Sequence, residues 1–207
     1  MVRWFWLGGP LLLLMGCTVG EGEGSVTSSR LFVENCWNGA FDLRPDFFAT
    51  NAFSDETQLI RVQRGDNLQE VSDGVMVLVN DTQAVLARKN QEILVGLPGG
   101  ASPLGVPLEY NPDPPLVTIA LYLHDSCHTE NATLHSVDGS ITFSSLFSGD
   151  VNEQDASRRL TRASFTAQFA NPRDLDPEGE TDPSLISTVV GKFSFYFQRG
   201  QPAQPFP

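Results

Sequence analysis

Apolar and polar residues alternate along much of this chain, and no other feature restricts its fold as strongly. The stretch ASFTAQFA, residues 163–170, places alanine and phenylalanine on one face and serine, threonine and glutamine on the other. The same period of two runs through VTIALYLH (117–124) and KFSFYFQ (192–198). Successive side chains of a strand point to opposite faces, so this period predicts β-strands with one buried face.

The remaining apolar stretches also favour an all-β fold. Further strand-like segments are residues 58–64, 75–79, 84–88 and 92–97. No long window shows the 3.6-residue apolar stripe of a helix. Short strands separated by turn residues are typical of antiparallel folds, so we predict an antiparallel β-sandwich, with a β-barrel as the alternative.

Turns and loops are expected between these strands. Asp138-Gly139 favours a hairpin turn because both residues tolerate positive φ, and residues 79–82 form a second turn candidate. Three longer segments lack the strand pattern: 97–115, 148–159 and 171–185. None of them is long enough to separate two domains, so residues 31–207 are predicted to form a single β-domain.

The first residues have the layout of a signal peptide. Arg3 supplies the positive start of residues 1–16, and Trp4 to Met15 form an apolar run of about a dozen residues, too short to cross a bilayer. The run ends in Leu14-Met15-Gly16-Cys17, which resembles a bacterial lipobox. The resemblance implies cleavage before Cys17, a diacylglycerol thioether on its sulfur and an acyl chain on its new amino group.

Residues 18–30 have almost no apolar content, and we expect them to form a flexible tether between the lipid and the domain. Two or three acyl chains give stable anchoring where one would not. By analogy with other lipoproteins, Thr18 stands where an aspartate would signal retention in the inner membrane. The expected location is therefore the cell envelope, at the outer membrane, with the membrane bound through the lipid anchor.

The chain contains three cysteines. If Cys17 carries lipid, Cys36 and Cys127 remain, and export passes through an oxidising compartment. We therefore predict a disulfide between these two residues; the alternative is two separate buried thiols.

Several longer segments are similar to parts of a group of uncharacterised bacterial lipoproteins. They are FDLRPDFFATNAF, IRVQRGDNLQEVSDGVMVLV, GSITFSSLFSGD and FYFQRGQPAQPFP. The resemblance implies a lipoprotein with an all-β fold, and it implies no catalytic residue.

The charge balance argues against a nucleic-acid partner. The chain has 25 acidic and 13 basic residues, with a formal net charge of −12. Binding to phosphates needs clustered cations. The densest basic group, Arg158, Arg159 and Arg162, is interpreted as a solvated strand edge.

Two polar clusters carry residue types that bind metals. His124, His128 and His135 match no zinc spacing, and we interpret them as part of a polar strand-end loop pinned by the disulfide. A second segment starts like a calcium loop but has Leu185 where the closing glutamate belongs; its acidic residues are Asp174, Asp176 and Glu178. Neither cluster leads us to expect a cofactor.

The leading hypothesis is a lipid-anchored envelope domain that acts by binding or structural interaction, with an unknown protein or small-ligand partner. One alternative is a lipoprotein that binds a small ligand or carbohydrate, for which an internal cavity would be the sign. Another is a metal-dependent enzyme built on the three histidines. No nucleophile elbow or phosphate loop is found, so catalysis is the least favoured class.

Overall fold

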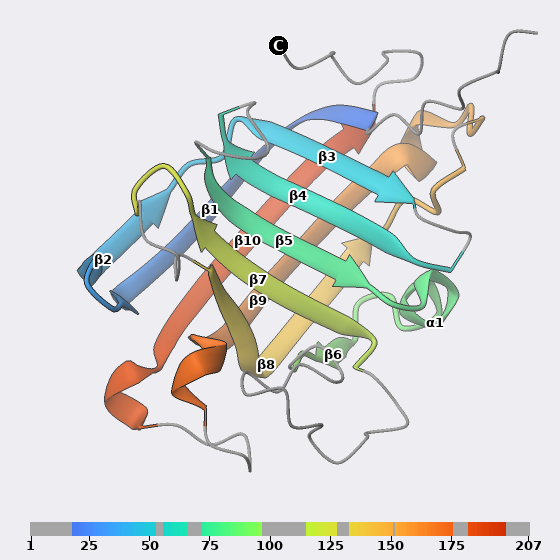
Figure 1. Ribbon diagram of the computed structural model, residues 1–207. Coiled ribbons are helices and arrows are strands. Elements are labelled where there is room, and N and C mark those ends of the chain that lie inside the picture. The colour runs from blue at the N-terminus through green and yellow to red at the C-terminus, as the bar shows by residue number, and fades with distance from the viewer. Residues whose placement is uncertain are drawn as a thin grey trace, which may run out of the picture.

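The structure is a computed structural model, and it describes residues 18–52, 56–65, 72–96, 115–127, 133–150, 152–175 and 182–197. Strands make up 62% of it and helices 12%. All strand pairs between named strands are antiparallel, and eight strands close into a barrel (Figure 1). The all-β prediction is confirmed, and the architecture is the β-barrel that was the alternative to a sandwich.

The elements follow one another along the chain as ten strands, one α-helix and three short 3-10 helices within the described residues. Their bounds are β1 Thr18–Val33, β2 Trp37–Leu43, β3 Phe47–Ala52, β4 Gln58–Arg64, β5 Asp73–Val79, α1 Thr82–Ala87, β6 Glu92–Leu94, β7 Val117–Leu123, β8 Thr133–Ser145, a 3-10 helix at Ala156–Arg159, β9 Leu160–Ala170, 3-10 helices at Pro172–Asp174 and Pro183–Leu185, and β10 Ser187–Phe197.

The barrel is flattened into two layers whose strands cross. A front layer has the order β3-β4-β5-β7, and a back layer has the order β2-β1-β10-β9-β8-β6 (Figure 1). The layers join at two corners, β1 with β3 and β7 with β8, and each corner has only three residue pairs. Crossed sheets that are joined at their corners are one way to close a barrel. The predicted sandwich differs from this barrel in that its two sheets would not be paired at the corners.

The core lies between the two layers and is rich in phenylalanine. On β9 and β10, every second residue is buried, as the alternation predicted. The rings of Phe48 and Phe195 stack across the interior with centroids 5.5 Å apart. The largest side chains with almost no exposure include five phenylalanines: Phe48, Phe143, Phe169, Phe193 and Phe195. The described interior is thus filled by side chains.

Residues 18–30 belong to β1, so the expectation of a flexible tether is wrong. β1 pairs with β10 from Gly20 to Thr27. Its low apolar content has a packing reason: a Cβ on Gly22 would lie 2.3 Å from the Cβ of Phe195 and from the carbonyl oxygen of Ser194. Glycine lets β1 approach β10 closely, and the phenylalanine rings of neighbouring strands supply the apolar contact that β1 lacks.

Replacing Gly22 by alanine should therefore destabilise the barrel. The added methyl group forces β1 away from β10, which should lower the free energy of unfolding by about 1 to 3 kcal/mol in urea denaturation. Gly39 in β2 is the matched control, because a Cβ there would meet no heavy atom within 4 Å. Equal stability of Gly22→Ala and Gly39→Ala would contradict this packing of β1.

Two local predictions are also corrected. Residues 84–88 were expected to be a strand, but most of them belong to α1, whose start is capped by Asp81 accepting a hydrogen bond from the N–H of Ala84 at 2.8 Å. Asp138-Gly139 is not a hairpin turn: β8 continues through it, with a register shift between Ser136 and Asp138. Gly139 has φ +124°, and a Cβ there would lie 2.4 Å from a carbonyl oxygen of β9. Close strand approach, rather than a turn, explains this glycine.

Candidate functional site

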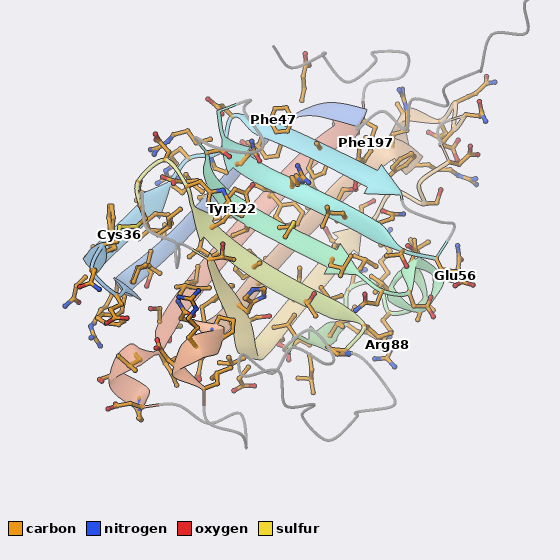
Figure 2. All side chains as sticks on the ribbon, in the orientation of Figure 1. Cys36, Phe47, Glu56, Arg88, Tyr122 and Phe197 are labelled. Atoms are coloured by element: carbon orange, nitrogen blue, oxygen red, sulfur yellow. A yellow bond between two sulfur atoms is a disulfide. The ribbon has the colours of Figure 1, made fainter. Side chains whose placement is uncertain are left out.

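The structure joins Cys36 and Cys127 in a disulfide, with Cα atoms 5.7 Å apart, and this confirms the predicted pair. Cys36 lies in the turn between β1 and β2 (Figure 2), and Cys127 follows β7. The bridge therefore holds the end of β1 to the end of β7. Cys17 lies outside the described residues, and its lipidation stays a prediction.

A buried carboxylate supports the turn that carries Cys127. Asp73 is fully buried at the start of β5. One oxygen accepts hydrogen bonds from the backbone N–H groups of Asp125 and Ser126 at 3.1 and 3.0 Å. The other accepts from the Ser126 hydroxyl and, at 2.9 Å, from Arg64. All these bonds close one end of the barrel, so the cluster is structural.

Tyr122 lies beside this cluster and has a partner of its own. Its hydroxyl donates to Gln63 Oε1 at 2.6 Å. Burial raises the pKa of Tyr122 above its ordinary value, Asp73 adds to the rise, and Arg61 opposes it. The phenol therefore stays protonated at neutral pH and acts as a fixed donor rather than a base.

The histidines do not form a cluster where the structure describes them. His124 follows β7, whereas His135 on β8 pairs with Ala120, four positions earlier along β7. Four positions in a strand span about 13 Å. Burial lowers the pKa of His135. His128 lies outside the described residues.

The acidic candidates are also separated or undescribed. Asp174 ends a 3-10 helix, and its pKa is raised by burial and, to a smaller extent, by the charge of Glu34. Asp176 and Glu178 lie outside the described residues. Within the part of the chain that the structure describes, no group of three or more His, Cys, Asp or Glu could hold a metal ion.

Two hollows lined by described residues lie on the outside of the back layer. We call this surface the outer face: the side of β1, β10, β9, β8 and β6 that points away from the core. One hollow has a volume of about 430 Å³. Its lining includes the side chains of Glu23, Arg44, Thr142, Ser144, Arg162, Ser164, Lys192 and Ser194. A second hollow of about 540 Å³ continues along the same strands past Thr166 and Ser140.

Strand register explains why these side chains meet. Lys192 on β10 pairs with Ser25 on β1 and with Ser164 on β9. Ser164 in turn pairs with Thr142 on β8, which pairs with Glu92 on β6. Paired residues of neighbouring strands project on the same side, so the five form one polar row across the sheet.

A neighbouring row adds a second cation. Ser194 pairs with Glu23 on one side and with Arg162 on the other. Arg162 donates from Nε to the Ser194 hydroxyl at 3.1 Å. The arginine is therefore held over the sheet by a neighbour, with the rest of its guanidinium available to a ligand.

Apolar side chains stand on the same outer face. Leu94, Val190 and Tyr196 are 76%, 49% and 47% exposed, and they are the large apolar side chains found exposed among the described residues. Tyr196 lies two positions beyond Ser194 on β10, so its side chain points to the same side. The outer face thus offers cations, hydroxyl groups and one aromatic ring.

The sequence analysis missed this surface. It used the alternation of β9 and β10 to find buried residues and treated the polar half of each strand as ordinary solvent-facing positions. The available signal was Arg162, Ser164, Lys192 and Ser194 in that polar half. Strand order and register were needed to bring them together.

Comparisons with protein-family models, with curated proteins and with solved structures find no match to this chain. The resemblance to bacterial lipoproteins therefore rests on the sequence segments quoted above. In the described part of the chain, no helix is both long enough and apolar enough to span a membrane.

Proposed function

We propose that this chain is a lipid-anchored protein of the cell envelope whose barrel acts by binding. The anchor is Cys17, which follows a signal-like apolar run and the lipobox residues Leu14-Met15-Gly16. The proposed location is the outer membrane, by analogy with lipoproteins that lack an aspartate after the cysteine.

The start of β1 bears on how such an anchor would hold the barrel. β1 begins at Thr18, the residue directly after Cys17. Acyl chains on Cys17 would therefore hold this end of the barrel at the lipid headgroups, with no spacer between lipid and strand. The domain would work close to the membrane surface rather than at the end of a tether.

The observation that supports binding is the hollow on the outer face. Its hydroxyl groups and the cations Arg162 and Lys192 project from three neighbouring strands of a closed sheet, β8, β9 and β10. Side chains held by a rigid sheet suit recognition through hydrogen bonds and charge. The metal-dependent enzyme, by contrast, gains no geometric support, because His124 and His135 stand apart.

Replacing Cys17 by serine tests the anchor. We expect the protein to move from the membrane fraction to the soluble fraction, because the acyl chains supply the membrane affinity. The intact mass of the unsubstituted protein should correspond to a chain that begins at Cys17 and carries acyl groups. The measurements are membrane fractionation and mass spectrometry.

The control is Gly39→Ala, which keeps Cys17 and the disulfide, adds a methyl group that meets no heavy atom within 4 Å, and should leave the protein in the membrane fraction. An unmodified mature chain that begins at Gly20 or later would refute the anchor. So would membrane association that survives Cys17→Ser.

A further inference from the structure

We propose that the outer-face hollow is a binding site for an anionic glycan, with Arg162 and Lys192 contacting its acidic groups. The inference rests on the proposed binding function and names the ligand class of its site. The chemistry expected of the ligand is a set of linked sugar rings that carry sulfate, phosphate or carboxylate groups.

The first argument is the placement of the two cations. Ser194 pairs with Arg162, and two positions earlier Lys192 pairs with Ser164, so the cations are diagonal neighbours on β9 and β10. Diagonal neighbours have Cβ atoms roughly 7 Å apart or less. Two positive charges at this separation repel each other, and a bound anion between them would relieve the repulsion.

The second argument is that these cations have no carboxylate partner although the chain is acidic. The net charge is −12, yet the ion pairs found among the described residues involve Arg44, Arg64 and Arg158. Glu23, diagonal to Lys192, and Glu92, at the edge of the row, line the hollows, and Glu21 on β1 and Asp138 on β8 share the outer face. None of these four carboxylates forms an ion pair with Arg162 or Lys192 among the described residues.

The third argument is the chemistry of the surrounding side chains. The hydroxyls of Thr142 and Ser164 line the hollow and can each donate and accept hydrogen bonds, as sugar hydroxyls require. Arginine binds carboxylate, sulfate and phosphate through paired N–H groups. Outside the hollow, Val190 lines the second hollow and the exposed ring of Tyr196 lies two positions beyond Ser194, and both offer apolar contact for the C–H faces of sugar rings.

The size and position of the site fit a ligand of the envelope surface. The hollow of about 430 Å³ falls within the range of small-ligand sites. Glu23 lies five positions along β1 from Thr18, a distance of about 17 Å in a strand. With the proposed anchor at Cys17, the hollow would lie near the membrane surface, within reach of membrane-proximal sugars.

The test uses the mature protein in a neutral detergent, with dextran sulfate as the probe and uncharged dextran of the same length beside it. We expect calorimetry to show binding of dextran sulfate and none of dextran. Lys192→Gln and Arg162→Gln should each weaken binding about tenfold, the value of one charge-assisted contact. Binding should also weaken as salt is raised.

The chain supplies a matched control of the same charge change. Arg173 lies in the 3-10 helix at Pro172–Asp174, beyond the end of β9 and outside both hollows. Arg173→Gln should bind dextran sulfate as the unsubstituted protein does. Circular dichroism and thermal melting should show that all three variants remain folded.

The proposal is overturned if dextran sulfate does not bind, if Lys192→Gln binds it as tightly as the unsubstituted protein does, or if uncharged dextran binds equally well. Glycerol phosphate is the probe that distinguishes a glycan ligand from the phosphate group of a lipid headgroup. If it binds as tightly as dextran sulfate and with the same dependence on Lys192, the ligand is a phosphate group alone and the glycan is refuted. None of these results changes the outcome of Cys17→Ser, so the anchor and the glycan site can fail independently.

Discussion

Replacing Cys36 and Cys127 by alanine should lower the free energy of unfolding by about 4 to 5 kcal/mol. The bridge joins residues separated by 91 positions. In the chain-entropy model, a crosslink that closes such a loop lowers the conformational entropy of the unfolded chain, and this stabilises the folded state by about 4 to 5 kcal/mol. The loss approaches the whole stability of many domains of this size. Urea denaturation of the oxidised protein and of the double variant measures it.

The slope of the urea transition gives a second readout of the same change. Without the bridge the unfolded chain is less compact, so the slope should increase while the midpoint falls. Reduction and alkylation of the unsubstituted protein should reproduce both effects. An unchanged midpoint after complete reduction would show that the bridge does not stabilise the barrel.

Replacing Asp73 by alanine should lower the free energy of unfolding by about 3 kcal/mol. The carboxylate is fully buried and accepts hydrogen bonds from two backbone N–H groups, from Ser126 and from Arg64. Its removal leaves the two backbone N–H groups and the Ser126 hydroxyl without this acceptor, while Arg64 keeps its ion pair with Asp125. The loss of hydrogen bonds to a buried charged group costs about this much. The measurement is again urea denaturation.

Asp42→Ala is the control for Asp73→Ala. Asp42 pairs with Arg44 at 3.1 Å, but both side chains are more than half exposed, at 58% and 71%. An exposed pair of this kind contributes about 0 to 1 kcal/mol. Equal effects of the two substitutions would refute the structural role of the buried carboxylate.

Asp73 and the disulfide should also depend on each other. Both hold the turn that follows β7: Asp73 through Asp125 and Ser126, and the bridge through Cys127. Residues that support one turn are not independent, so the combined loss should be smaller than the sum of the separate losses. A double-mutant cycle measures this coupling.

The outer face of the back layer carries the hollows, whereas the described interior holds the buried side chains of the core. The lipid attachment proposed at Cys17 and the glycan binding proposed near Lys192 would together hold the protein at the membrane with a polar sheet presented to its surroundings. The two proposals use different residues and different measurements, and neither requires an internal cavity.

The sequence by itself determined the strands with clear alternation, above all β9 and β10, and their buried faces. The alternation in residues 163–169 and 192–197 is a local consequence of strand geometry, so Phe165, Phe169, Phe193 and Phe195 could be placed in the core without knowing any neighbour. Cysteine number and compartment likewise led to the pair Cys36 and Cys127, because disulfide chemistry needs only two thiols and an oxidising route.

Tertiary structure alone decided how the strands are arranged. Alternation says which face of a strand is buried but not which strand lies beside it. Barrel closure at the β1–β3 and β7–β8 corners therefore could not be predicted from any local sequence pattern. Gly22 resembled part of a tether because the apolar groups that pack against β1 belong to β3 and β10. The site on the outer face has the same origin: Arg162 and Lys192 are thirty positions apart along the chain, and only antiparallel pairing of β9 with β10 makes them neighbours.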